Sequence, residues 1–485
     1  MYQQKLLLAP SSAVRSRAWS MSSLPDSRAS ILDSTAVVSD TSANQVAWAS
    51  IASDTWRPQP GAPTNDKKSP PPQIATEGRA ISDDVLYIHQ LELDLVHTGG
   101  LASQDLTPNE RYLGRDSQAL LDGRPSILIH DVSQGGAFAQ ESYLTGRPSP
   151  IASQIGVDTH LNNFGVTRDA NGVEHFLFTD VDKTSPNLRN EIDLEKTAVS
   201  VLEHAQRSGR STQDQQKLVG DLTSSYLAEI RRLAATGEQP PAALTAQEAT
   251  GAIQQAMEET QRSNVSHPQT SDRTPASSSS ETSNVSDQTR AAIANSLSEY
   301  VRQPGMNSKV AYPLQIVHAV QEKSSSGSSF GMTNYRISLA PKEPGGAPVE
   351  LELKEVVPAP GSSDPGNMHS ADAANVVANA QYFDGSASPV LGHAQVDGHS
   401  YLVRPIEANT PKVSFDKLSF ADQESYVQNV GVVLARMHAR NADDLRNITT
   451  WAAGNDAVIQ QNLERFAADY EHHLQALSAT LRDSR

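Results

Sequence analysis

Carboxylate and amide side chains follow one another near residue 160 in a pattern suited to phosphoryl transfer. Asp158 and Asn163 form a D-x4-N pattern, and Asp180-Val-Asp182 begins 17 residues after Asn163, where the apolar stretch 174–179 ends. Phosphoryl transfer needs an Asp that accepts the proton of the attacking hydroxyl, and an Asn and an Asp that hold Mg²⁺. We therefore expect Asp158 to be the base and Asn163 and Asp180 to be metal ligands.

A glycine- and serine-rich turn and a lysine form a second group. Gly327, Ser329 and Gly331 lie between two expected strands, where small residues let backbone N–H groups approach phosphate oxygens. Lys354 lies on a later strand, from which its ammonium could reach nucleotide phosphates. Taken singly, the turn fits a plain hairpin and the lysine an exposed strand residue. Their order is that of the small lobe of a kinase, but here this lobe follows the Asp-Asn loop.

The same acidic pair allows two other chemistries. Asp180, Asp182 and Thr184 match the DxDxT signature of haloacid-dehalogenase-type phosphatases, in which the first Asp is the nucleophile and the second the acid/base. Those enzymes also need an acidic pair at strand ends, and the late pair Asp443-Asp444 follows an expected helix instead. A DxD motif can likewise chelate Mn²⁺ in a nucleotide-sugar transferase, yet the surrounding sequence predicts no sheet for a sugar nucleotide.

An α+β framework must position these residues. An Asp397-Gly398 pair between apolar runs predicts a hairpin, and the adjacent His472 and His473 are expected on a solvated helix face. Hydrophobic periodicity predicts strands at 174–179, 310–320, 334–339, 349–357, 389–396 and 400–406, and helices at 190–206, 213–235, 246–262, 290–302, 371–383, 421–440 and 456–481.

Composition indicates that part of the chain does not fold. Only 37% of the 485 residues are hydrophobic and 5% aromatic, and the apolar shortfall is concentrated in segments rich in Ser, Thr, Pro and Ala. The predicted organisation is a disordered leader at 1–82, a helical-lobe part with the catalytic loop at 83–262, a disordered Ser/Thr insert at 263–288, a small β lobe at 289–410 and C-terminal helices of the large lobe at 411–485.

Charge and cysteine content exclude several functions. A net charge of −17 argues against nucleic-acid binding, and the absence of cysteine excludes disulfides, thiolate catalysis and zinc fingers. No stretch predicts a membrane span, and the apolar run 6–10 is too short for a Sec signal peptide. The Ser-rich leader resembles those of proteins injected by type III systems, so we expect a protein of the bacterial cytoplasm or an effector that meets host proteins.

Six motifs in one order point to a family. They are VDTHLNNFG, DVDK, SGSSFG, LELKEV, YLVRP and LARMHAR. Over about residues 125–445 the chain resembles the bacterial domain-of-unknown-function family 2252, in which these motifs read approximately GDAHxxNFG, DFDE, GxGSxG, LQVKEA, YxVRQ and LARAHAR. The resemblance implies a kinase-like protein whose motifs are permuted relative to those of aminoglycoside phosphotransferases. The resemblance implies a bilobal protein-kinase-like fold with a small antiparallel β lobe and a mainly helical lobe.

The resemblance also implies roles for single residues. Asp158 would be the base, Asn163, Asp180 and Asp182 would hold Mg²⁺, and Lys354 would pair with the phosphates of ATP, while Arg404 would lie in the cleft and Gly327, Ser329 and Gly331 would hold phosphates. The sequence departs from the pattern where Lys183 replaces an acidic residue, where serines replace the leading glycines of the turn, and where Ala378 stands at the position of an acidic partner for the lysine.

These observations predict a phosphotransferase that moves the ATP γ-phosphate to a hydroxyl of a protein or small molecule. The departures favour a second interpretation, an impaired pseudokinase or effector scaffold that binds host proteins. The DxDxT-type phosphatase remains a third.

Overall fold

The computed structural model describes residues 77–99, 106–133, 136–169, 171–266, 280–303, 315–324, 326–341, 348–357, 372–388, 390–406 and 413–483. The helices are α1 (Glu77–Gly99), α2 (Leu106–Leu113), α3 (Ser117–Gly123), α4 (Pro125–Val132), α5 (Glu191–Arg207), α6 (Thr212–Thr236), α7 (Gly251–Ser266), α8 (Asp287–Tyr300), α9 (Ala373–Asp384), α10 (Phe420–His438), α11 (Ala442–Ala452) and α12 (Asp456–Asp483). The strands are β1 (Phe164–Arg168), β2 (Glu174–Phe178), β3 (Ser280–Asn284), β4 (Ile316–Ser324), β5 (Thr333–Leu339), β6 (Val349–Glu355), β7 (Gly392–Val396) and β8 (His399–Pro405).

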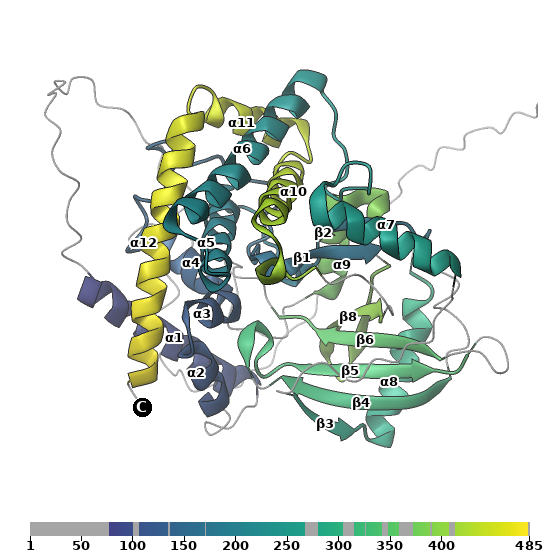
Figure 1. The fold of residues 1–485 in the computed structure, drawn as a ribbon. Coiled ribbons are helices and arrows are strands. Elements are labelled where there is room, and N and C mark those ends of the chain that lie inside the picture. Colours follow the sequence, from purple (N-terminus) through teal and green to yellow (C-terminus); the bar gives the residue numbers. More distant parts are fainter. Residues whose placement is uncertain are drawn as a thin grey trace, which may run out of the picture. The chain divides into compact units, whose positions relative to one another are not determined.

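The strands form two separate antiparallel sheets, which confirms the α+β class. β1 and β2 make a hairpin, and the other six strands pair in the order β3-β4-β5-β6-β8-β7 (Figure 1). The predicted turn between β7 and β8 has Asp397 and Gly398 at φ values of 50° and 84°. These left-handed conformations are those of a type I′ hairpin, for which Asp-Gly is a preferred pair.

Two large hydrophobic cores organise the described residues, beside a small cluster of three side chains. The smaller one joins the six-stranded sheet to α8, whose Ile293 and Leu297 pack with Ile337 and Leu353 of the sheet. The larger one gathers α5, α6, α10 and α12 together with the β1–β2 hairpin and α9. Helix α9 therefore packs with the helical core, although it lies between β6 and β7 in the chain.

Local signals fix the ends of the central helices. The Ser211 side chain caps α6 by accepting a hydrogen bond from the Asp214 N–H, and Gly237 ends that helix at φ 71°, a conformation that glycine adopts without strain. Helices α6 and α10 approach closely at Gly431, where an added Cβ would lie 2.6 Å from the carbonyl oxygen of Leu222.

The structure differs from the sequence predictions at several boundaries. Helix α1 begins at 77, inside the expected leader, and residues 1–76 lie outside the described part of the chain. Both ends of the predicted insert 263–288 belong to regular elements, because α7 extends to Ser266 and β3 pairs with β4 from Ser280 onward. Residues 267–279 lie outside the described part of the chain. An edge strand needs only backbone hydrogen bonds on one side, so its polar sequence gave no signal.

The prediction that His472 and His473 share a solvated helix face is wrong for His473. His472 is exposed, whereas His473 is buried and its Nε2 lies 2.7 Å from Oδ2 of Asp84. Adjacent helix residues point about 100° apart, so one can face solvent while the next faces the core.

None of the helices in the described part of the chain combines the length and hydropathy needed to cross a bilayer.

Candidate active site

Helix α5 holds the loop that carries Asp158. The backbone N–H groups of Gly156 and Val157 each donate to the Asp193 carboxylate at 2.7 Å. Val157 has a φ of 65°, which is unusual for a β-branched residue. Such a conformation costs about 1–3 kcal/mol and persists only where the surroundings impose it. The two charge-assisted hydrogen bonds to Asp193 supply that constraint.

Two further helices hold Asp193 in turn. Nε2 of His438, at the end of α10, lies 3.0 Å from Oδ2 of Asp193. On its other side, Nδ1 of His438 lies 3.0 Å from the hydroxyl of Tyr226 on α6. All three side chains are buried. The histidine of the LARMHAR motif thus positions the carboxylate that shapes the Asp158 loop.

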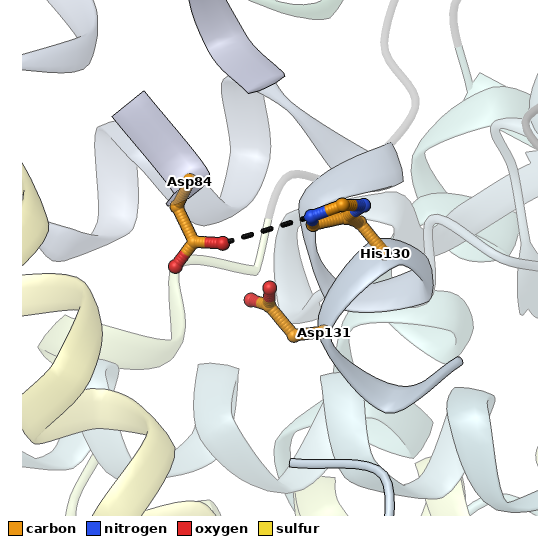
Figure 2. Close-up of side chains that lie close together, drawn as sticks. All are labelled: Asp84, His130 and Asp131. Carbon is orange, nitrogen blue, oxygen red and sulfur yellow. Dashed lines mark ion pairs between the residues drawn. The ribbon is translucent and has the colours of Figure 1, made fainter. Parts of the chain in front are cut away.

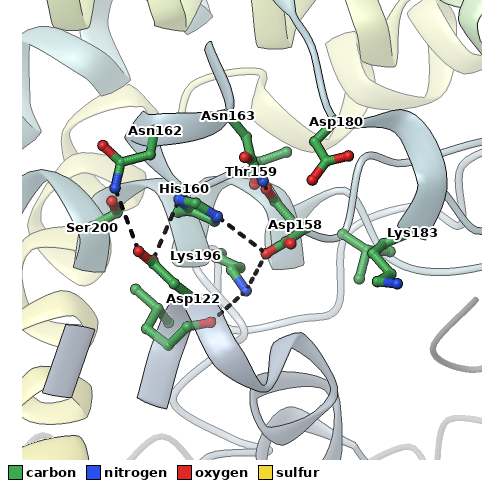
Figure 3. A network of polar contacts seen from close by, with 12 residues as sticks. Asp122, Asp158, Thr159, His160, Asn162, Asn163, Asp180, Lys183, Lys196 and Ser200 are labelled. Carbon is green, nitrogen blue, oxygen red and sulfur yellow. Dashed lines mark hydrogen bonds and ion pairs between the residues drawn. The ribbon is translucent and has the colours of Figure 1, made fainter. Parts of the chain in front are cut away.

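The Asp158 carboxylate forms a buried ion pair with α5. Lys196 Nζ lies 2.8 Å from Oδ1 of Asp158 and also donates to the carbonyl oxygen of Leu121 at 2.9 Å (Figure 3). His160 Nε2 lies 3.7 Å from the same Asp158 oxygen, and its Nδ1 lies 3.3 Å from Oδ1 of Asp122. Asp158 and Lys196 are both 0% exposed.

The β1–β2 hairpin explains the spacing between Asn163 and Asp180. Phe164 pairs with Phe178, so the residues just before β1 and just after β2 lie next to each other. The Thr179 N–H donates to the carbonyl oxygen of Asn163 at 2.7 Å, and the Asn163 side-chain nitrogen donates to the carbonyl oxygen of Asp158 at 2.9 Å. The three residues predicted as one acidic and amide cluster do form one.

Lys354 joins this cluster from the other hydrophobic core. Its Nζ lies 2.8 Å from Oδ1 of Asp180 and 3.1 Å from Oδ2 of Asp182. Asp180 and Lys354 are 174 residues apart in the sequence. Lys183, the departure from the family pattern, places its Nζ 3.4 Å from the same Asp182 oxygen. Two ammonium groups therefore face the buried Asp182.

The charges shift one another's pKa values. Burial and the charge of Asp182 raise the pKa of Asp180, and Lys354 opposes this rise only in part. Burial would also raise the pKa of Asp182, but Lys183 and Lys354 outweigh it and hold that pKa well below its usual range. Burial alone would lower the pKa of Lys354, whereas the two carboxylates raise it above its ordinary value. Asp182 and Lys354 are thus held charged at neutral pH.

Alternation along β6 places the remaining charged groups. Arg404 lies opposite Glu352 in the β6–β8 register and its Nε donates to Oε2 of Glu352 at 2.7 Å. Glu352 is two residues from Lys354 and so shares its face of the sheet, which places Arg404 on the same face as Lys354. Glu355 points to the opposite face, where it accepts a hydrogen bond from the Thr333 N–H at 2.6 Å.

The two glycines of the glycine-rich turn have left-handed backbone conformations, and their N–H groups already have partners within the protein. Gly327 and Gly331 have φ values of 79° and 80°. The Gly327 N–H donates to Oδ1 of Asn109 at 3.2 Å, and the Gly331 N–H donates to the carbonyl oxygen of Ser324 at 2.9 Å. Ser329 belongs to the same turn and its carbonyl oxygen accepts from Met332. Neither glycine N–H points freely toward a ligand here.

Sequence reasoning missed several residues that hold the site. Asn109 of α2 and Arg124, just before α4, both bond to Gly327, the latter through Nη1 and the carbonyl oxygen at 3.4 Å. The polar face of α5 was missed because its apolar positions dominated the pattern. Its residues follow the i, i+3, i+4, i+7 spacing that one helix face requires, and they are Asp193, Lys196, Thr197 and Ser200.

The fold and site together define an α+β protein. Two aspartates that follow a hairpin of the helical core form ion pairs with a lysine of the six-stranded antiparallel sheet. The chain belongs to the bacterial family described as "Uncharacterized protein conserved in bacteria (DUF2252)", whose model matches residues 127–477. This confirms the family predicted from the six motifs. No curated protein and no solved structure is similar enough to the chain to count as a match.

Proposed function

We propose that this protein is a kinase-like phosphotransferase that moves the γ-phosphate of ATP to a hydroxyl of a protein or small molecule. The observation that carries the proposal is the 2.8 Å contact between Lys354 Nζ and Oδ1 of Asp180. A phosphate-binding lysine and a metal-binding aspartate must lie within the span of one nucleotide. Asp180 follows β2, which packs in the larger core, and Lys354 lies on β6, which packs in the smaller one, yet their charged groups are in contact.

The residues beside Lys354 fit a magnesium ion. Mg²⁺ prefers oxygen ligands, and the Asp180 and Asp182 carboxylates and the Asn163 amide oxygen are of that kind. The side-chain nitrogen of Asn163 is bonded to the Asp158 carbonyl oxygen, which turns its Oδ1 away from that carbonyl. The ion would neutralise charge on the phosphate oxygens. Lys354 would then leave its two carboxylates and pair with phosphate.

Two contacts must open before Asp158 and the turn can act. Asp158 is fully buried against Lys196, so an acceptor hydroxyl reaches hydrogen-bond distance only after neighbouring groups move. Gly327 likewise has to exchange the Asn109 oxygen for a phosphate oxygen. We infer that nucleotide binding and loop opening occur together, with Ser329, Gly331 and Arg404 bordering the nucleotide.

The same two contacts favour a second candidate, a pseudokinase scaffold that keeps the fold without phosphotransfer. A buried Asp158–Lys196 pair and an engaged turn are also the expected features of a site that no longer turns over.

Nothing in the geometry favours the phosphatase alternative. Asp443 and Asp444 lie in the first turn of α11, and Asp180 follows an antiparallel hairpin.

Transfer of radiolabelled γ-phosphate from ATP to water and to the protein itself tests the proposal without a known acceptor. We expect activity in the wild type and its loss in Asp158→Ala and Asp180→Ala. Asp443→Ala, at an exposed surface position, serves as the matched control and should keep wild-type activity. Equal activity in all four proteins would refute the assigned roles.

Nucleotide-dependent thermal stabilisation separates the enzyme from the scaffold. A site that binds ATP and Mg²⁺ gains stability as ligand concentration rises above Kd. We expect the wild type to show such a shift and Lys354→Met to lose it. A scaffold that has lost nucleotide binding shows no shift in either protein.

The proposed place of action, the bacterial cytoplasm or a host cell reached through a type III system, depends on the leader. Its composition suits a secretion signal, and host proteins would then be the partners. A reporter fused to residues 1–82 should enter the host cytosol only when the type III apparatus is intact. Entry that does not depend on the apparatus would contradict this proposal.

A further inference from the structure

A second group of ligand-type side chains lies where α1, α4 and α12 meet. Asp84 comes from α1, and His130 and Asp131 come from α4. One ligand atom of each lies within 4.8 Å of the others, and the Asp131 carboxylate points toward Asp84 and His130 (Figure 2). None of these residues belongs to the Lys354 site.

The two carboxylates are buried without enough positive charge. Asp84 is 2% exposed and Asp131 is 1% exposed. The hydroxyl of Tyr470 donates to Oδ2 of Asp131 at 2.7 Å, but Oδ1 of Asp131 is buried and has no hydrogen-bond partner. Two carboxylates this close need either a shared proton or a cation between them.

Two imidazole groups, those of His130 and His473, lie beside the Asp84 carboxylate. His130 Nε2 lies 3.9 Å from Oδ1 of Asp84, and its ring stacks on Tyr87 with 4.1 Å between centroids. The His130 side chain is 39% exposed, so an ion can enter from that side. His473 Nε2 lies 2.7 Å from Oδ2 of Asp84 and fixes the orientation of this carboxylate.

We propose that Asp84, His130 and Asp131 bind a divalent transition-metal cation, with His473 orienting Asp84. Zn²⁺ suits this set of one imidazole and two carboxylates, whereas Mg²⁺ and Ca²⁺ prefer oxygen ligands alone. Asp84 lies before the family-matched residues 127–477, and His130 and Asp131 lie inside them. The ion therefore fastens α1 to the family's helical core. The unpaired oxygen of Asp131 is the observation that points to the ion.

Calorimetric titration of the full-length protein with Zn²⁺ tests the site. We expect the wild type to bind one equivalent and Asp131→Asn and His130→Gln to lose it. Replacing His473 by Gln should weaken binding about 10–100-fold, the usual effect of removing a group that orients a ligand. Glu110→Gln is the matched control, because Glu110 belongs to the neighbouring group of His89 and Glu92. That variant should bind like the wild type.

The variants are chosen to remain folded. An asparagine at 131 can still accept the Tyr470 hydrogen bond, and His130 is part-exposed. Far-UV circular dichroism without metal checks that each variant is folded. If Asp131→Asn does not fold, the titration of His130→Gln alone tests the site. Zn²⁺ at 100 times its Kd should raise the folding equilibrium constant of the wild type about 100-fold. Hydrogen exchange of the α1 amides should slow with Zn²⁺ in the wild type and not in His130→Gln.

Three results would overturn the proposal. A wild type that binds no Zn²⁺ would indicate that Asp84 and Asp131 share a proton instead. Unchanged binding in His130→Gln, or loss of binding in Glu110→Gln, would place the ion elsewhere.

Discussion

Replacing Lys354 by methionine removes the ammonium that lies between Asp180 and Asp182 and keeps most of the apolar stem. The distances of 2.8 and 3.1 Å show that one ammonium serves both carboxylates. Removing one partner of a buried ion pair costs about 3–5 kcal/mol. Asp182 is 1% exposed but Asp180 is 23% exposed, so solvent screens part of the loss. We expect Lys354→Met to lower the free energy of unfolding by about 2–4 kcal/mol at pH 7.

The loss should depend on pH in a defined direction. Lys354 and Lys183 hold the pKa of Asp182 below its usual range despite its burial, so this carboxylate stabilises the folded wild type above the unfolded pKa of about 3.9. That contribution disappears as pH falls through the lower folded pKa. In the variant the folded pKa rises, so protonation relieves the repulsion. The difference between the two proteins should therefore be larger at pH 7 than near pH 4.

Urea unfolding followed by circular dichroism at pH 7 and pH 4.5 measures both effects. Lys417→Met is the matched control, because Lys417 is exposed, and its effect should stay within about 0.5 kcal/mol. The double variant Lys354→Met/Asp180→Asn should recover part of the loss, since it removes one of the two like charges. If Lys354→Met is as stable as the wild type at pH 7, or if its loss is equal at both pH values, the ion pair does not exist in solution.

Three other substitutions test separate features. Asp193→Ala leaves two buried N–H groups and a histidine without their acceptor, and should lower the free energy of unfolding by about 3–5 kcal/mol in urea titrations. Gly431→Ala should cost about 1–3 kcal/mol by the same measurement, because the new Cβ meets the Leu222 carbonyl oxygen at 2.6 Å. Burial raises the pKa of Asp384 to about 8, so its folded form binds a proton that the unfolded form releases, and the wild type loses stability as pH rises from 4 to 8. Asp384→Asn should therefore be more stable than the wild type at pH 8 by about 1–3 kcal/mol and show little difference at pH 4 in thermal melts, with Asp372→Asn at an exposed position as the matched control.

Predictable features of the site follow from short-range rules. The spacing of Asn163 and Asp180 reflects one two-stranded hairpin, and alternation along β6 separates Lys354 from Glu355. The meeting of Lys354 with Asp180 was inferred from the order of motifs rather than from spacing, because local patterns carry no information on contacts across 174 residues.

Other features depend on tertiary contacts that leave weak sequence signals. Helices α2, α3 and α4 are at most eight residues long, too short for a clear hydrophobic period, so Asn109 and Arg124 had no predicted element. Burial of Asp193 and Lys196 runs against the usual exposure of charged residues and becomes intelligible only with their partners in view. The engaged glycine turn and the burial of His473 were not predictable for the same reason.

The long sequence separation between Asp180 and Lys354 has a consequence for synthesis. At about 5–20 residues per second, a ribosome needs roughly 9–35 s to pass from one to the other. During that interval Asp182 is without its partner from β6, and α6 still lacks α10, against which it packs in the finished protein. The nascent helical half therefore exposes apolar surface until the last helices emerge, and during that time it is more prone to aggregation than the finished protein.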